Sequence, residues 1–344
     1  MKTNNYFQIF AWLLLFSGIS IGQPQLYNPI GCRSLAMGNT GYILADDESA
    51  LFYNPAGLGF SNYRWNGGAF TYHQVPLTEM PGSYYGFAYQ DDRIPKFGFA
   101  GYVNHFSDEV LEYTSDFTGA IDPNSPIVEK RSDNTFAMGM GYCFQSNDIF
   151  DNSAGIGIKY FQENYNDIQS STIAFDAGYL LRIIKQFRFG IVFRNIGPDY
   201  SFHYNDSITS KYPLPLTVVT GIGYSDFFNA GKIRILDISS EISLGKILPK
   251  DYDKFFFNSG VETGLFKTLF FRFGYAHPNT ITFNGSDEIT WGTGVSVFNH
   301  FDFDFFTSDY YNSKSMIKPT SSGYSFSFKR GLNWSAKDWT WWRN

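Results

Sequence analysis

The chain has 344 residues, a formal net charge of -6 and a mean hydropathy of -0.22, and 20% of its residues are aromatic. Its 37 Phe, 24 Tyr and 33 Gly differ from the composition of an ordinary soluble core, in which Leu and Ala dominate. The charge pattern gives no basic surface, so we expect no nucleic-acid partner. One large all-β domain is compatible with this length.

Residues 1–22 have the pattern of a secretory signal peptide. Lys2 precedes an apolar run from Phe7 to Ile21, and small residues come before Gln23, so cleavage is predicted after Gly22. No cysteine follows that position, which argues against a lipoprotein. A membrane anchor is the alternative interpretation, and the run is short for a spanning helix.

Residues 23–62 form a segment whose sequence differs from the repetitive pattern that follows. Glycines at 31, 38 and 41 permit tight turns, and Asp46 or Asp47 can cap a short helix over residues 48–53. Pro55 should end that helix. The simplest interpretation is a capped helical turn that leads into the next element.

From Tyr63 onward, large apolar residues alternate with small or polar ones at a period of two. The segments are about 9 to 13 residues long, which is typical of tilted strands that cross a membrane. In residues 301–305, for example, phenylalanine alternates with Asp302 and Asp304. The fourteen predicted strands are Arg64–Gln74, Ser83–Gln90, Lys96–Phe106, Asn134–Gln145, Ala154–Asn164, Ser170–Ile183, Phe187–Asn195, Leu216–Ser225, Lys232–Gly245, Lys254–Thr263, Thr268–His277, Glu288–Phe298, Phe301–Ser308 and Gly323–Arg330.

The lengths of the connections support a barrel. If the first strand starts in the periplasm, all six connections on that side are short, and the other side holds the four longest, Ser107–Asp133, Ile196–Pro215, Pro278–Asp287 and Asp309–Ser322. This alternation is typical of outer-membrane barrels. The sequence therefore predicts an all-β fold, a fourteen-stranded antiparallel transmembrane β-barrel over residues 63–330, in the outer membrane of a diderm bacterium.

Residues 331–344 form a tail rich in tryptophan. Tryptophan favours the membrane interface, so the tail is expected on the periplasmic rim, and a docking peptide for a partner protein is the alternative. The tryptophans are Trp334, Trp339, Trp341 and Trp342.

No catalytic or metal-binding pattern stands out. The five histidines lack ligand spacing, and Cys32 and Cys143 lie far apart, so two buried thiols are expected, with a disulfide as the alternative. We predict no metal, no cofactor and no enzymatic activity. Paired carboxylates on one strand face would suit a glycosidase, but solvated acids are ordinary in a barrel lumen. These acids are Asp237 with Glu241 and Asp302 with Asp304.

With a barrel predicted, residues 31–58 resemble the N-terminal hatch of the FadL-like outer-membrane superfamily, particularly its PorV/PorQ branch. The shared pattern is Gly-x-Arg-Ser-x-Ala-Met-Gly, followed by Ala-Asp-Asp and Asn-Pro-Ala-Gly-Leu. Further matches lie at residues 194–198, 214–216, 260–262 and 271–275. The hatch motif comprises Gly31, Arg33, Met37, Gly38, Asp46, Asp47, Asn54, Pro55, Ala56 and Gly57.

The resemblance implies that residues 23–62 fold inside the barrel as a plug, where Asp46, Asp47 and Asn54 would hold the plug to the wall. For the PorV/PorQ branch it implies a role in type IX secretion with secreted cargo or secretion proteins as partners. That is our first hypothesis, because the connection Ser107–Asp133 is long enough for a protein-binding surface.

For FadL-like transporters the resemblance implies that hydrophobic ligands cross the barrel or leave sideways through its wall. Our second hypothesis is therefore an uptake channel for hydrophobic small molecules such as long-chain fatty acids, with aromatic lumen or wall residues such as Phe175 and Tyr179. A surface enzyme is a third hypothesis and rests only on the paired acids.

Overall fold

The computed structural model describes residues 30–61, 63–75, 82–91, 97–115, 121–146, 149–166, 168–204, 207–248, 254–277, 287–298, 300–311 and 320–331. Residues 30–61, here called the inner segment, contain helices α3 (Cys32–Ala36) and α4 (Ala50–Tyr53) and the 3₁₀ helix η1 (Pro55–Phe60). Helix α4 is the short helix predicted over residues 48–53, and it ends before Pro55 as expected. No helix in the described residues has the length and apolar character needed to cross a membrane.

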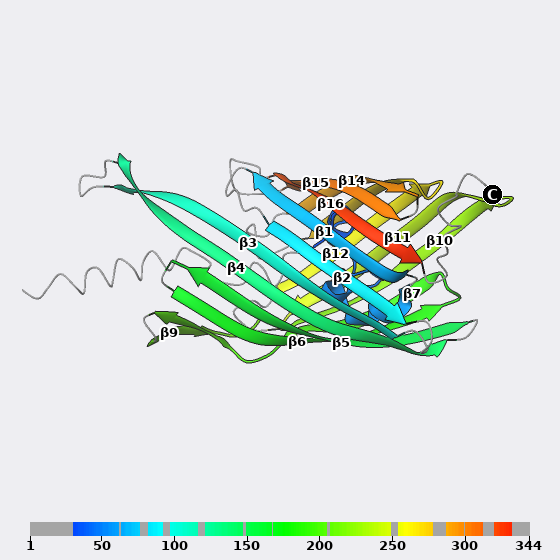
Figure 1. The fold of residues 1–344 in the computed structure, drawn as a ribbon, viewed down its shortest axis with the longest axis horizontal. Coiled ribbons are helices and arrows are strands. Elements are labelled where there is room, and N and C mark those ends of the chain that lie inside the picture. The colour runs from blue at the N-terminus through cyan, green and yellow to red at the C-terminus, as the bar shows by residue number, and fades with distance from the viewer. Residues whose placement is uncertain are drawn as a thin grey trace, which may run out of the picture.

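Fourteen strands close into a barrel, which confirms the predicted fold. Successive barrel strands pair antiparallel, β5 pairs with β6, and the last strand pairs with the first, as Figure 1 shows. Closure satisfies the backbone groups that an open sheet would leave at its edges. The barrel strands are β1 (Tyr63–Val75), β2 (Gly82–Asp91), β3 (Phe97–Ser115), β4 (Ile121–Ser146), β5 (Phe150–Tyr165), β6 (Ile168–Ile183), β7 (Phe187–Ile196), β10 (Thr217–Ala230), β11 (Ile233–Ile247), β12 (Lys254–Leu265), β13 (Leu269–His277), β14 (Asp287–Val297), β15 (Phe301–Tyr311) and β16 (Thr320–Gly331).

The alternating sequence pattern places large apolar side chains on the outer face of the wall. On β4, Phe136 is 48% exposed and Met138 is 57% exposed, whereas Ala137 between them is buried. On β11, Ile242 is 54% exposed and Glu241 is buried. An apolar exterior around a small and polar interior is the arrangement that a lipid-embedded barrel requires.

Two connections that we predicted as long loops contain strands instead. Most of Ser107–Asp133 continues β3 and β4 as a ribbon that projects beyond the other strands (Figure 1). The connection Ile196–Pro215 contains the hairpin β8 (Tyr200–Tyr204) and β9 (Ser207–Tyr212), in which β8 pairs with β6. The sequence did not reveal them, because charged residues interrupt the alternation within residues 107–133 and the strands of the β8–β9 hairpin have only five and six residues.

Inward-facing glycines of the wall make room for the inner segment, which the strands enclose in Figure 1. A Cβ added at Gly274 would come closer than 3.0 Å to backbone atoms of Met37 and Gly38, and one at Gly155 would do the same with Pro55. The backbone of the inner segment therefore touches the backbone of the wall. Other wall glycines in equally close contact with the inner segment are Gly68, Gly86, Gly98, Gly139, Gly141, Gly178, Gly190, Gly223, Gly260 and Gly292.

Replacing one of these glycines should displace the inner segment. Gly274→Ala is expected to cost about 1–3 kcal/mol, because backbone atoms cannot move aside as a flexible side chain can. Gly67→Ala is the matched control, since a Cβ there meets only the Gly86 carbonyl oxygen at 3.4 Å. Heat-modifiability on gels and limited proteolysis measure the effect, and equal behaviour of the two variants would contradict this packing.

Candidate functional site

A cavity of about 470 Å³ lies between the inner segment and the wall. It is at the short-turn end of the barrel, where turns such as residues 231–232 and 266–268 join the strands, because Arg234 and Lys267 line it. The inner segment contributes Arg33 and residues 46–48 to the lining. The site is therefore a charged vestibule formed partly by the inner segment.

All four acids predicted for the lumen line this cavity. Three of them form ion pairs with basic residues of the wall, so their charges are already balanced. Asp302 and Asp304 thus act as counter-charges, and neither is the uncommitted carboxyl that a glycosidase would use as its general acid. The pairs are Asp302 with Lys329 (2.5 Å), Asp304 with Arg272 (2.6 Å) and Asp237 with Arg234.

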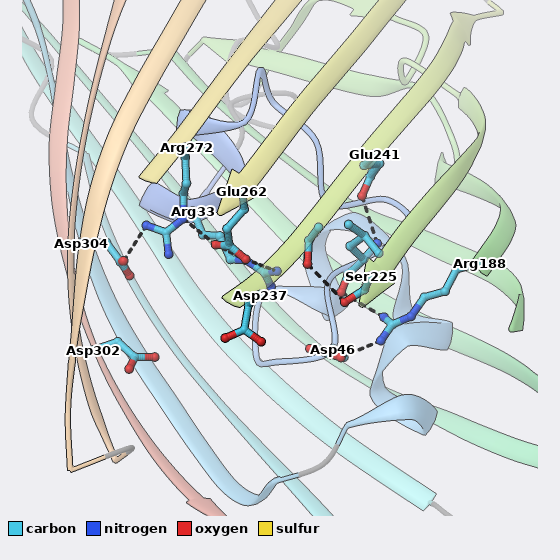
Figure 2. Close-up of polar contacts among 12 residues, drawn as sticks. Arg33, Asp46, Arg188, Ser225, Asp237, Glu241, Glu262, Arg272, Asp302 and Asp304 are labelled. Carbon is cyan, nitrogen blue, oxygen red and sulfur yellow. Dashed lines mark hydrogen bonds and ion pairs between the residues drawn. The ribbon is translucent and has the colours of Figure 1, made fainter. Parts of the chain in front are cut away.

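A chain of alternating charges fixes α3 to the wall, as Figure 2 shows. The Arg33 Nη2 atom lies 2.8 Å from Glu262 Oε1, and the same carboxylate accepts a hydrogen bond from Arg272 Nε at 2.6 Å. Arg272 then reaches Asp304. The negative charge of Glu262 raises the pKa of Arg33, so the inner segment carries a permanent cation at this point.

A second set of contacts fixes residues 41–46 to β7 and β11 (Figure 2). Arg188 donates hydrogen bonds to Asp46 Oδ2 at 2.9 Å and to the Leu44 carbonyl oxygen at 3.0 Å. The fourth predicted acid, Glu241, accepts hydrogen bonds from the backbone N–H groups of Gly41 and Leu44. Glu241 is therefore satisfied by the inner segment and not by a cation.

Asp47 and Asn54 form hydrogen bonds within the inner segment, whereas Asp46 reaches the wall. Asp47 Oδ1 accepts a hydrogen bond from the Ser49 backbone N–H at 3.0 Å. The Asn54 side chain donates to the Tyr42 carbonyl oxygen and accepts from the Ala56 N–H, both at 3.1 Å, so Asn54 caps η1. Asn54 thus holds the inner segment in its own shape.

The remaining motif residues fit where a larger residue or another backbone conformation would not. Gly31 and Gly38 have φ values of 80° and 71°, in the left-handed region that favours glycine. The Gly38 N–H donates to Thr290 Oγ1 at 2.8 Å, and Met37 and Gly57 are buried. The motif is therefore a set of shape and docking positions.

Glu48 is the functional candidate that the sequence interpretation missed. The residue is 8% exposed, and its side chain enters a gap between Gly68 and Gly86, which face each other on β1 and β2. Burial, and then the neighbouring charge of Asp47, raise the pKa of Glu48 to about 8. The sequence held one sign of this contact, which is the pair of consecutive glycines at 67–68 in the first predicted strand. Glycine inside a strand weakens it and often marks a place where another group approaches closely.

The residues Arg194 and Asn195, which belong to the similarity noted at 194–198, lie at a break in the β6–β7 ladder. The Arg194 guanidinium carbon is 4.3 Å from the Phe52 ring centroid, so this arginine packs on α4. Asn195 accepts a hydrogen bond from Lys159 at 2.8 Å, and Lys159 pairs with Asp176 at 2.7 Å. This buried group joins the wall to the inner segment on the side away from the charged vestibule.

The two aromatic residues that we predicted to contact hydrophobic ligands, Phe175 and Tyr179, do not line the vestibule. Phe175 is 49% exposed and Tyr179 is 37% exposed on the outer face, so neither lines the lumen, because both occupy the outward phase of β6. Cys32 and Cys143 are buried and free. The signal peptide and the tryptophan tail, with Trp334, Trp339, Trp341 and Trp342, lie outside the described residues.

No protein-family model and no curated protein matches the chain. Solved structures do match it. The Ralstonia pickettii toluene transporter TbuX has 13% identity, with 88% of this chain and 98% of that chain covered, at a TM-score of 0.60. The P. putida toluene transporter TodX has 11% identity, with 88% of this chain and 99% of that chain covered, at a TM-score of 0.59. A Pseudomonas aeruginosa FadL homologue has 12% identity, with 87% of this chain and 97% of that chain covered, at a TM-score of 0.51. This chain has the same fold as these proteins.

Removing the shared carboxylate should loosen the inner segment. Glu262→Gln leaves Arg33 and Arg272 without their common counter-charge, which is expected to cost on the order of 3 kcal/mol. Urea unfolding in detergent micelles measures the loss. Asp237→Asn is the control, because its partner Arg234 is 35% exposed and such pairs contribute about 1 kcal/mol or less. Equal losses would show that Glu262 is no anchor.

The inner segment should also dock less tightly as pH rises. The pKa of Glu48 is raised from 4.5 to about 8, so the docked state holds a proton that the free carboxyl loses near pH 4.5. The stability of wild type relative to Glu48→Gln should therefore fall between about pH 4.5 and pH 8 and change little above that. Unfolding temperatures at several pH values test this, and parallel curves for both proteins would refute it.

Proposed function

We propose that the protein is a non-enzymatic outer-membrane channel for small hydrophobic molecules, the second of the two functions that the sequence suggested. The observation that carries the proposal is the similarity in fold to toluene transporters over nearly the full length of both chains. A membrane-facing apolar exterior and a closed barrel are consistent with that location. Monoaromatic hydrocarbons and other apolar molecules of similar size are the proposed substrates.

The inner segment is the proposed plug of this channel. It touches glycines on many wall strands and is fixed by ion pairs to β7 and β12. The ion pairs that hold it join side chains and are separate from the hydrogen bonds between the barrel strands, so the plug can be released without unfolding the barrel. A plug held in this way closes the pore to ions and leaves a movable element for transport.

Aromatic contacts inside the barrel support an apolar substrate. Tyr42 and Tyr53 of the inner segment have ring centroids 5.3 Å apart, and Phe52 contacts Tyr102 of β3 at 6.2 Å. Tyr102 in turn lies 5.4 Å from Tyr84. Such rings offer a small aromatic molecule contacts that compensate for those it displaces.

At one apolar recess, the barrel wall has no side chains between the membrane-facing surface and the inner segment. A recess of about 530 Å³ lies on the outer face of β6, β7, β10 and β11, between side chains such as Phe189 and Ile222. Its floor includes the paired residues Gly190 and Gly221, and Ile43 of the inner segment lies on their inner side. Only backbone separates the inner segment from the membrane-facing surface here.

Handling of secreted cargo, our first hypothesis from the sequence, finds no support in the comparisons. The connection Ser107–Asp133 that motivated it is mostly a two-stranded ribbon. We therefore retain the PorV/PorQ resemblance as a sequence observation and base the proposed function on the transporter fold.

Transport can be tested by producing the protein in the outer membrane of a host that lacks such channels. Toluene uptake should rise above the empty-vector level. Asn54→Ala should increase leakage of small polar dyes, because it removes two hydrogen bonds that shape the inner segment, while the gel shift of the barrel stays unchanged. Toluene uptake at the empty-vector level with correctly folded protein would contradict the proposal.

A further inference from the structure

The charges that line the vestibule do not balance. Eight acidic and five basic residues line the cavity, and four of the basic residues already form ion pairs with wall acids. The fifth, Lys267, lies in the turn between β12 and β13. Asp46 pairs with Arg188, and Glu241 binds backbone N–H groups, so among the described residues Asp47 and Glu48 are the two lining acids that have neither an ion pair within 4.0 Å nor such a set of backbone donors from the wall or plug on both oxygens. Arg33 and Lys329 act on them only from a greater distance.

Glu48 gives stronger evidence for a bound ligand than Asp47 does. More than nine-tenths of its surface is buried, it lines the cavity, and its Oε2 atom has no hydrogen-bond partner within the described part of the chain. A buried carboxyl oxygen without a partner is costly, and native proteins usually supply water, an ion or a ligand. The ionisable groups that act on it are Asp47, Asp302, Lys329 and Tyr84.

The surroundings of Glu48 fit an organic cation better than a metal ion. In the described residues, no group of three or more His, Cys, Asp or Glu could hold a metal. The space of about 470 Å³ is much larger than an ion needs. On the same inner face of β1 and β2, Phe70 and Tyr84 pair two positions along from Gly68 and Gly86, and both rings line the cavity.

We propose that this cavity binds the ammonium group of a small organic cation with an apolar or aromatic body, with Asp47 and Glu48 as its counter-charges. The ammonium group donates hydrogen bonds to the Glu48 carboxylate, and Phe70 and Tyr84 contact the apolar body. Rings beside a cation also attract it directly. The site is separate from the proposed hydrocarbon transport, because a neutral hydrocarbon gains nothing from the two carboxylates.

Titration calorimetry of the purified protein in detergent tests this site, with benzylamine as the cationic probe and benzyl alcohol as its neutral counterpart. Benzylamine should bind at pH 7 and displace a proton from Glu48, whose pKa of about 8 leaves it mostly protonated there. Proton release is counted from the heats in two buffers with different ionisation enthalpies. Benzyl alcohol should bind at least about tenfold more weakly, a difference of about 1.4 kcal/mol.

Glu48→Gln keeps the shape of the side chain and should lose about tenfold in benzylamine affinity together with the proton release. Asp237→Asn, which alters an acid already paired with Arg234, should stay within about threefold. The gel shift confirms folding of both variants.

Unchanged affinity in Glu48→Gln, equal binding of benzyl alcohol, or displacement of benzylamine by equimolar potassium would each overturn the proposal. Toluene uptake is measured separately. If the protein transports toluene but does not bind benzylamine, only the cation site is refuted. If it binds benzylamine but does not transport toluene, only the proposed function is refuted.

Discussion

The inner segment fills the lumen of this barrel because the wall facing it has glycine at many contact positions. Gly155 and Gly274 bring wall backbone within contact distance of Pro55 and Gly38, so no side chain separates the two backbones there. Without the inner segment these glycines would line an open, poorly packed channel. The shape of the wall and the shape of the inner segment therefore depend on each other.

Ion pairs fix the inner segment to the wall in addition to this packing. Glu262 lies between Arg33 and Arg272, and Arg188 pairs with Asp46, so each of these three arginines has a carboxylate within hydrogen-bonding distance. Buried charges are tolerated only when they are paired. These ion pairs join side chains and are separate from the hydrogen bonds that close the barrel wall.

The two sides of the inner segment differ in chemistry. Its aromatic side contacts rings such as Tyr102, and Arg194 packs on Phe52. Its other side faces the charged vestibule at the short-turn end, where Glu48 lies in the gap between two glycines. A neutral hydrocarbon favours the first environment and is poorly solvated in the second, whereas an organic cation favours the second. Tyr84 lies where the two environments meet, because its ring is 5.4 Å from that of Tyr102 and it also lines the vestibule.

The barrel could be predicted from the order of the residues alone, because lipid outside and a crowded lumen inside impose an alternation that shows each strand, as at Phe136–Met138. It also marked the inner segment, since glycine and Asn54 have local conformational roles. Which wall residue meets which part of that segment depends on the three-dimensional arrangement of the strands and could not be predicted. The contacts of Arg33 with Glu262 and of Glu48 with Gly68 join positions far apart in the chain, and a period-two pattern places a residue inside the barrel without specifying its height or its neighbour across the lumen. The projecting β3–β4 ribbon was not predicted, because charged residues interrupt the period-two alternation there.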